Sequence, residues 1–371
     1  MANRLQQLHD AGVSVWLDFI ERPMLHNGDL ERRIREDALT GMTSNPTIFE
    51  KALAEGSAYD EQVRGAPRDL SPLDLFELVE TTDVRDACDV LRPVHDATDG
   101  VDGRVSIEVD PRLARDTEAT TRAAEVLWAR VDRPNLFVKI PATVEGLPAI
   151  TAALAQGISV NVTLIFSLQR YRAVLDAFLD GLEQARAAGL DLRTIASVAS
   201  FFVSRVDTAV DARLDEIGTP EAAALRGTAA IANARLAWGV YEDVVASDRW
   251  ASLAAAGARP QRPLWASTGV KDPAYPDTRY VDELVVAGSV NTMPESTFEA
   301  VADHGDVRGD TVTGTQDASA VLLDRIEALG VSIDAVTEQL EDEGLRKFET
   351  SWTELLDSVQ QGLGAADGSR R

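Results

Sequence analysis

The stretch Asn135-Leu136-Phe137-Val138-Lys139-Ile140-Pro141-Ala142-Thr143 places a lysine inside a short apolar run. The apolar residues predict a buried strand, and Pro141 ends that strand abruptly. A lysine within such a strand is unfavourable unless it is paired or neutral. Because desolvation lowers the pKa of a lysine, and a neutral amine attacks carbonyls, Lys139 is a candidate Schiff-base lysine. The alternative is a lysine on an edge strand that faces water.

Outward from this stretch, segments typical of strands alternate with segments typical of helices about eight times. The predicted strands are 14–19, 41–46, 104–111, 137–140, 158–166, 195–203, 263–268 and a last one after 281–287. This alternation predicts an α/β fold whose parallel sheet closes into a (β/α)8 TIM barrel. An open doubly wound sheet is the alternative, but no glycine-rich phosphate fingerprint follows the first strand.

We expect residues 1–371 to form a single barrel domain with additional helices. Residues 57–98 read as a helical insert, because Leu73, Phe76 and Val79 begin an apolar pattern with helical spacing. Further helices, at about 318–361, are expected to close the chain. The sequence contains no long Pro/Gly/Ser linker and no internal repeat.

The composition limits the classes of function. A formal net charge of −25 opposes binding to nucleic acid and to anionic membranes, so a phosphate substrate would need basic residues concentrated inside a site. Cys88 is the only cysteine, which excludes an internal disulfide. No apolar run approaches a membrane span, and the N-terminus lacks the core of a signal peptide. We therefore expect a cytoplasmic protein.

Polar side chains recur where the predicted strands end. They are Asp18, Asn45, Glu108, Lys139, Asn161, Thr163, Ser200 and Ser267. Each alone has a structural explanation: Asp18 suits the start of a turn, and Asn45 suits the bend before Pro46. The ends of barrel strands meet at one face, which is where barrel active sites lie. As a set, these groups around one lysine form a candidate imine site.

The chemistry of an imine explains these residue types. An amine adds to a ketone to give a carbinolamine, and the loss of water from it needs an acid. Cleavage of the adjacent C–C bond needs a base for the proton of the departing alkoxide. Asn and Thr side chains can orient hydroxyl groups and a water. Metal catalysis is disfavoured, because no His or carboxylate cluster shows ligand spacing.

Five segments together resemble the transaldolase family, in its longer-chain branch. They are Gly41-Met42-Thr43-Ser44-Asn45-Pro46-Thr47, Ser106-Ile107-Glu108-Val109-Asp110, Phe137-Val138-Lys139-Ile140-Pro141-Ala142-Thr143, Asn161-Val162-Thr163-Leu164-Ile165-Phe166-Ser167 and Val290-Asn291-Thr292-Met293-Pro294. The resemblance implies a class I mechanism without metal or cofactor. It implies transfer of a dihydroxyacetone unit from sedoheptulose 7-phosphate to glyceraldehyde 3-phosphate, giving erythrose 4-phosphate and fructose 6-phosphate in the non-oxidative pentose phosphate pathway.

The resemblance also implies a role for each catalytic residue. Lys139 would form the Schiff base with a ketose phosphate. Asp18 would take the proton as the C3–C4 bond breaks and return it in the reverse direction. Glu108 would act through a water held with Thr163 while the imine forms and hydrolyses.

Substrate binding is implied for a second set of residues. Asn45 and Asn161 would bind hydroxyls of the dihydroxyacetone unit. The segment Ser200-Phe201-Phe202-Val203-Ser204-Arg205 resembles the family's sixth strand, so Ser200, Phe202 and Arg205 join the site, with Arg205 as a phosphate ligand. Shorter members have Ala-Ser-Phe-Arg-Asn on the seventh strand. Here the chain reads Ala266-Ser267-Thr268-Gly269-Val270-Lys271, so Ser267 and, as a point charge, Lys271 are the candidates.

Two other functions remain open. One is a class I lyase of the fructose 6-phosphate aldolase type, which cleaves rather than transfers and uses nearly the same residues. The other is a non-enzymatic barrel that binds sugar phosphates. The expected partners are small sugar phosphates, with neither nucleic acid nor membrane, and the protein is expected to be a monomer or a homodimer.

Overall fold

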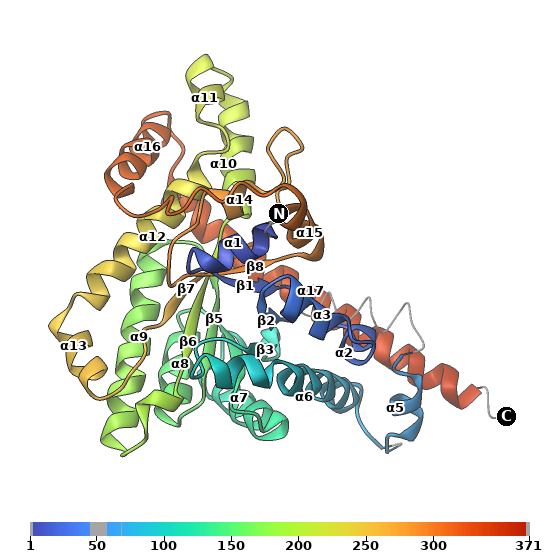
Figure 1. The fold of residues 1–371 in the computed structure, drawn as a ribbon. Coiled ribbons are helices and arrows are strands. Elements are labelled where there is room, and N and C mark those ends of the chain that lie inside the picture. The colour runs from blue at the N-terminus through green and yellow to red at the C-terminus, as the bar shows by residue number, and fades with distance from the viewer. Residues whose placement is uncertain (1–2, 45–57, 68, 369–371) are drawn as a thin grey trace.

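Eight parallel strands close into a barrel in the order in which they occur in the chain (Figure 1). The computed structural model describes residues 3–44, 58–67 and 69–368. The strands are β1 (Ser14–Leu17), β2 (Leu39–Thr43), β3 (Arg104–Glu108), β4 (Leu136–Pro141), β5 (Val160–Ile165), β6 (Ser197–Phe202), β7 (Arg262–Ala266) and β8 (Val290–Met293). The predicted (β/α)8 barrel is confirmed.

Helices surround the barrel and follow its strands, so the strands are buried on both faces. The helices before β4 are α1 (Arg4–Asp10), α2 (Arg22–His26), α3 (Asp29–Glu36), α5 (Asp60–Gly65), α6 (Pro72–Ala97), η1 (Pro111–Leu113) and α7 (Thr117–Val131). Those between β4 and β7 are α8 (Gly146–Ala155), α9 (Leu168–Ala187), η2 (Leu192–Thr194), α10 (Ser204–Ile217), α11 (Pro220–Leu225), α12 (Ala229–Val245) and α13 (Asp248–Ala255). The last are α14 (Arg279–Asp282), α15 (Glu295–His304), α16 (Gln316–Ala328) and α17 (Ile333–Gly368). None of the described helices is both long and apolar enough to cross a membrane.

Some predicted elements have different bounds in the structure. The segment 57–98 is not helical throughout, because α5 ends at Gly65 and α6 begins only after its N-cap Ser71. The helical region predicted after β6 is divided into α10 to α13. The first break has a local cause: Gly218 has a left-handed φ of 66°, and Thr219 caps the next helix. The segment 281–287 contains the end of α14 and precedes the last strand, β8, as predicted.

The final helix, α17, lies against the C-terminal mouth of the barrel. It contacts α6, α10, η1 and β5, and its own C-terminal end reaches toward α5 (Figure 1). Phe76 of α6 and Trp352 of α17 meet edge to face with ring centroids 5.2 Å apart. The barrel mouth is therefore bordered by two helices that lie more than 200 residues apart in the chain.

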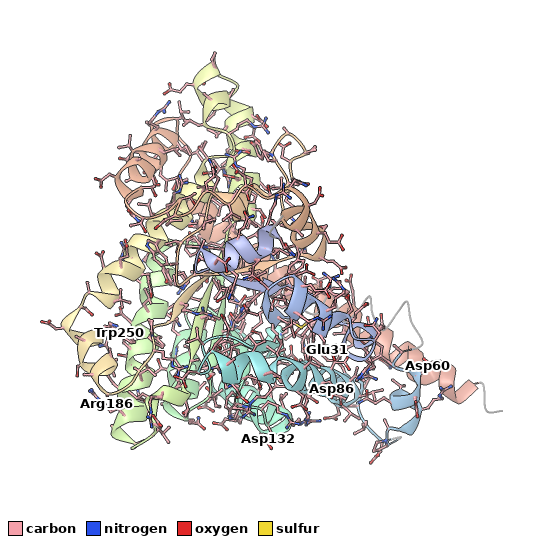
Figure 2. The ribbon with its side chains drawn as sticks, in the orientation of Figure 1. Glu31, Asp60, Asp86, Asp132, Arg186 and Trp250 are labelled. Atoms are coloured by element: carbon pink, nitrogen blue, oxygen red, sulfur yellow. The ribbon has the colours of Figure 1, made fainter. Side chains whose placement is uncertain are left out.

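The opposite, N-terminal end of the barrel is closed by a polar cluster. Arg262 forms an ion pair of 3.0 Å with Asp102 and donates a hydrogen bond of 2.7 Å to Ser14. Ser14 in turn donates to Asp102. These groups satisfy one another, and they lie at the end of the barrel opposite to the C-terminal face, where barrel active sites lie. Exposed acidic residues such as Glu31, Asp60 and Asp132 are distributed over the outer helices and loops (Figure 2).

Gly41 of β2 offers a direct test of packing inside the barrel. A Cβ added there would lie 2.5 Å from Nε1 and 2.7 Å from Cδ2 of the Trp16 indole, which is fully buried. We expect Gly41→Ala to lower the free energy of unfolding by about 1–3 kcal/mol, because a close-packed core resists an extra methyl group. Urea unfolding followed by tryptophan fluorescence measures this change. Ala at the uncrowded Gly65 is the control, and equal stability of the two variants would contradict the prediction.

Candidate active site

Lys139 lies in β4 with its amine at the centre of the barrel mouth. Its neighbours in register are Glu108 on β3 and Asn161 on β5. The side chain is 7% exposed, and Nζ donates hydrogen bonds to Glu108 Oε2 at 3.2 Å and to the Ser44 carbonyl at 3.0 Å. The structure therefore places Lys139 in a buried, polar site. The alternative prediction, a lysine on an edge strand that faces water, is wrong.

Glu108 is the carboxylate next to this amine. One of its oxygens accepts from Lys139, while Oε1 is buried and has no hydrogen-bond partner among the described residues. Burial raises the pKa of Glu108 above its ordinary value; the charge and hydrogen bond of Lys139 oppose that rise, and the charge of Asp18 adds to it. Burial and Lys139 thus act on the pKa of Glu108 in opposite directions, and carboxyl groups with such perturbed pKa values often exchange protons in active sites.

Thr163, like Glu108, has a buried side-chain oxygen, Oγ1, without a hydrogen-bond partner in the described part of the chain. It lies on β5 two residues beyond Asn161 and pairs in register with Pro141. The β5–β6 register shifts just after this point, and the next residue, Leu164, has a left-handed φ of 61°. Such strained bulges re-aim side chains next to active sites. Thr163 and Glu108 thus offer two unsatisfied oxygens to a ligand.

Asp18 follows β1 at the seam where the barrel closes. Its backbone N–H donates to the carbonyl of Met293 on β8 at 2.8 Å. Thr43 Oγ1 donates to Asp18 Oδ1 at 2.7 Å, and Thr43 and Thr292 Oγ1 atoms lie 2.9 Å apart. Because the carboxylate takes the proton of Thr43, Thr292 must be the donor to Thr43. These two threonines, which sequence reasoning missed, orient Asp18.

Asn161 is held by hydroxyls from two other strands. Ser200 on β6 donates to Asn161 Oδ1 at 2.7 Å, and the Asn161 amide donates to Ser106 Oγ at 3.0 Å. All three side chains are buried. The structure therefore brings Asn161 and Ser200 together as predicted. Asn45, also predicted for this site, lies outside the described residues.

The predicted phosphate ligands lie beside one hollow with a volume of about 600 Å³. Arg205 and Lys271 both line it, and the guanidinium of Arg205 lies 5.3 Å from the ring of Phe202. Burial lowers the pKa of both Arg205 and Lys271. Ser267, with a left-handed φ of 55°, has its Oγ 3.0 Å from Ser204 Oγ and accepts the Ser204 N–H through its carbonyl. Its backbone thus ties the end of β7 to the start of α10.

The comparisons with known proteins agree over almost the whole chain. The family described as Transaldolase/Fructose-6-phosphate aldolase matches residues 15–359. The chain belongs to this family. A transaldolase of Thermobifida fusca (strain YX) is 66% identical over 366 residues, covering 98% of this chain and all of the relative. A transaldolase of Acidothermus cellulolyticus is 58% identical over 371 residues, covering all of both chains. A transaldolase of Mycolicibacterium smegmatis is 58% identical over 367 residues, covering 98% of both.

Membership of the transaldolase family confirms the resemblance of the five segments. Three side chains from these segments, Glu108, Lys139 and Asn161, lie in register on the neighbouring strands β3, β4 and β5.

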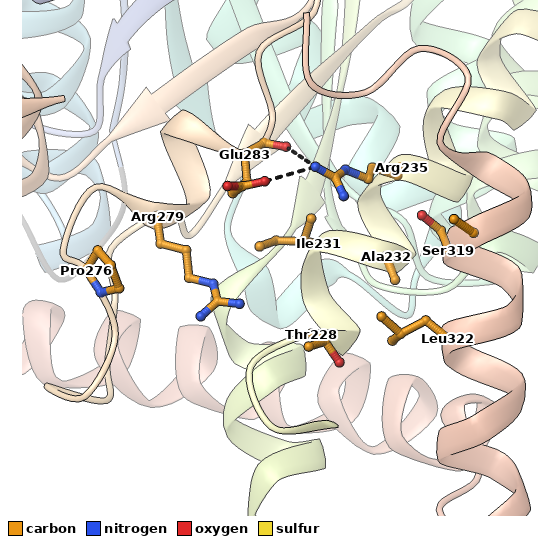
Figure 3. Close-up of a pocket in the computed structure, with 10 residues that line it drawn as sticks. Thr228, Ile231, Ala232, Arg235, Pro276, Arg279, Glu283, Ser319 and Leu322 are labelled. Carbon is orange, nitrogen blue, oxygen red and sulfur yellow. Dashed lines mark hydrogen bonds and ion pairs between the residues drawn. The ribbon is translucent and has the colours of Figure 1, made fainter. Parts of the chain in front are cut away.

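Among the residues that the structure describes, no group of three or more His, Cys, Asp or Glu side chains is close enough together to hold a metal ion. A second hollow, of about 410 Å³, lies between α12, α14 and α16 (Figure 3). Of its two arginines, Arg235 is paired with Glu283 at 3.0 Å, and none of the predicted site residues lines this hollow.

Two residues of this transaldolase family member reach the site without having been predicted. Glu80 on α6 is 2% exposed, and its Oε2 has no partner in the described part of the chain. Phe348 on α17 has its ring centroid 5.9 Å from Lys139 Nζ. Both lie on helices whose apolar spacing suggests only core packing. A polar residue on the apolar face of the 57–98 segment was the one available signal for Glu80.

Glu80 predicts a pH-dependent stability. Burial, and after it the charge of Glu108, raises the pKa of Glu80 well above its ordinary value. The folded state therefore keeps Glu80 neutral at pH values where the unfolded chain ionises it, and stability is lost as pH rises above 4.5 toward the folded-state pKa. Glu80→Gln removes this loss. We expect its gain in unfolding free energy over the wild type to grow by up to about 1.4 kcal/mol per pH unit in that window.

Urea unfolding at pH 5 and pH 8 measures this gain. Glu31→Gln is the matched control, because it makes the same chemical change at an exposed position on α3 (Figure 2). A difference between Glu80→Gln and the wild type that is the same at both pH values would contradict a neutral, buried Glu80.

Proposed function

We propose that this chain is a transaldolase that transfers a dihydroxyacetone unit between sugar phosphates through an imine on Lys139. The observation that supports this most is the position of the buried Lys139 amine, within hydrogen-bonding distance of both Glu108 and the Ser44 carbonyl. The full-length likeness to curated transaldolases supports the same chemistry. The reaction is the conversion of sedoheptulose 7-phosphate and glyceraldehyde 3-phosphate into erythrose 4-phosphate and fructose 6-phosphate.

Imine formation requires Lys139 as a neutral amine. Glu108 lies 3.2 Å from Nζ, so it can accept the proton that the ammonium must lose. The amine then adds to the ketone carbon, and the alkoxide takes a proton to give a carbinolamine. Loss of the hydroxyl group as water needs a proton, and Glu108 supplies it through a water held with Thr163. Their unsatisfied oxygens, Glu108 Oε1 and Thr163 Oγ1, support this role.

Cleavage of the C3–C4 bond requires removal of the proton from the C4 hydroxyl. Asp18 accepts this proton as the aldose phosphate departs, and the electrons of the broken bond pass to the iminium of Lys139. The bond from Thr43 fixes the carboxylate of Asp18 in place. The retained three-carbon unit then attacks the carbonyl of the acceptor aldose phosphate, and Asp18 returns its proton to the new hydroxyl.

The remaining residues bind the substrate. Asn161 and Ser200, with Asn45, hold the hydroxyls of the three-carbon unit. Phe202 and Ser267 border the chain of the sugar, and Arg205 and Lys271 hold the phosphate at the hollow that both of them line.

The protein works in the cytoplasm on small sugar phosphates, as a monomer or homodimer. It forms one domain over residues 1–371, with the helical insert at about 57–98 and the C-terminal helices at about 318–361.

Borohydride trapping tests the imine. The protein is incubated with fructose 6-phosphate and reduced, and the modified peptide is identified by mass spectrometry. We expect a reduced adduct on Lys139. An adduct on another lysine, or no adduct on folded protein, would overturn the assignment.

The second candidate is a lyase of the fructose 6-phosphate aldolase type, which the family description itself includes. The two reactions differ in whether an aldose phosphate or a proton resolves the three-carbon intermediate. Consumption of fructose 6-phosphate is therefore measured with and without erythrose 4-phosphate. Transfer requires the acceptor, and equal consumption without it would favour the lyase.

A further inference from the structure

The hollow beside Arg205 and Lys271 has two further basic residues in its lining, Arg213 and Lys347. Arg213 donates hydrogen bonds to the Ala209 carbonyl and to Gln339. Lys347, on α17, lines the same space and is exposed to solvent at its rim. The charge of Lys347 is close enough to that of Lys271 to help lower the pKa of Lys271, as does the charge of Arg205. Three positive charges from the start of α10, the loop after β7 and α17 therefore converge on one space.

These three cations have no ion pair with the residues that the structure describes. Most of the described arginines, among them Arg193 and Arg249, do form ion pairs in this chain of 61 acidic and 36 basic residues. Positive charges that lie together repel one another, and a bound anion relieves that repulsion. The arrangement thus suits a dianionic phosphate.

The composition adds an independent observation. The chain contains 32 arginines and only four lysines, which are Lys51, Lys139, Lys271 and Lys347. Lys51 lies outside the described residues. Of the other three, one is the amine at the barrel mouth and two line the hollow. Arginine supplies nearly every other positive charge in this chain. Lys139, Lys271 and Lys347 differ from those residues because each carries a compact ammonium group.

The position of α17 is well defined. Gly344 allows the helix to approach closely, because a Cβ there would lie 3.0 Å from Leu164 Cδ2 and 3.5 Å from Arg205 Nη1. Glu341 accepts two hydrogen bonds from Arg170, at 3.1 and 3.2 Å, which hold the helix against α9. One turn after Gly344, the adjacent residues Lys347 and Phe348 face the hollow and the Lys139 amine respectively.

We propose that Lys347 is a third phosphate ligand, through which α17 makes the site specific for phosphorylated sugars. This rests on the proposed function, because Phe348 borders the imine and Lys347 meets the phosphate at the other end of the substrate. The hollow also has carboxylates in its lining, Glu216 and Glu343. Glu343 accepts a hydrogen bond of 2.6 Å from Gln339, and its charge also acts on Arg205, but the basic residues of the lining outnumber these two carboxylates.

Lys347→Gln tests this with two donors, fructose 6-phosphate and dihydroxyacetone, which has no phosphate. The rate of borohydride-trapped adduct formation is measured for each at subsaturating concentration. We expect the rate with fructose 6-phosphate to fall roughly tenfold, as for loss of one partly exposed charge-assisted contact. With dihydroxyacetone we expect the wild-type rate. Lys347→Arg, which keeps the charge, is expected to recover most of the loss.

Arg346→Gln is the matched control, because it removes the same charge from the neighbouring residue of α17, which does not line the hollow. Equal rates for the wild type and Lys347→Gln with fructose 6-phosphate would overturn the proposal, as would an equal fall with both donors or in the Arg346 control. If the wild type forms no adduct at all, the proposed function fails. Calorimetric titration with inorganic phosphate then tests separately whether Lys347 binds phosphate. Equal phosphate affinity of the wild type and Lys347→Gln would overturn that role.

Discussion

Replacing Lys139 with arginine is expected to abolish turnover, with a fall in kcat/KM of roughly 10⁴-fold or more, as for loss of other covalent nucleophiles. A guanidinium stays protonated and offers no lone pair for attack on a carbonyl. The substitution keeps a positive charge beside Glu108, whose carboxylate lies 3.2 Å from the present amine. The loss would therefore report the missing nucleophile and not an uncompensated carboxylate. Coupled assay of transfer from fructose 6-phosphate to erythrose 4-phosphate measures it.

The Lys139→Arg variant must be shown to be folded. The longer side chain enters a close-packed site, so a loss of about 1–3 kcal/mol in the free energy of unfolding is expected. Circular dichroism and urea unfolding establish this directly. Turnover above about 1% of the wild-type value by a folded variant would be incompatible with an imine at this position.

Glu108→Gln is expected to lower kcat/KM by roughly 10²- to 10⁴-fold, the range for removal of a general acid or base. The amide oxygen can still accept from Lys139, so the hydrogen bond that now measures 3.2 Å has a replacement. What is lost is the exchange of protons during imine formation. Single-turnover trapping with fructose 6-phosphate should show slower adduct formation in this variant.

The pH profile gives a second readout for Glu108. Burial raises the pKa of Glu108 above 4.5, and its ionised form must take the proton of Lys139. Activity of the wild type should therefore rise with pH through an apparent pKa above 4.5, which is an acid limb that Glu108→Gln lacks. If the same limb persists in the variant, a group other than Glu108 is responsible for it.

The barrel and much of its site were predictable because parallel strands impose their own geometry. Once 104–111 and 137–140 are adjacent strands, Glu108 and Lys139 are neighbours at the same end, as the register shows. Asn161 and Ser200 come from the next two predicted strands, and in the structure their side chains are hydrogen-bonded. Each prediction followed from local pattern and from the rule that strand ends share one face.

Contributions from distant helices were not predictable in this way. Glu80 and Phe348 lie on α6 and α17, where apolar spacing describes packing but not the partner. Their approach to Lys139 depends on how two helices cross the barrel mouth, which tertiary packing decides. Thr43 and Thr292 were missed for a different reason. They lie within predicted strands, but their contact with Asp18 depends on closure of the barrel between β8 and β1.

The closure of the barrel between β8 and β1 has a consequence for folding during translation. The carbonyl that receives the N–H of Asp18 belongs to Met293, which is synthesised about 275 residues later. At translation rates of about 5–20 residues per second, roughly 15–55 seconds separate the synthesis of these two residues. A nascent chain that contains Lys139 but not yet β8 therefore lacks the strand pairing that holds the Asp18 backbone in place.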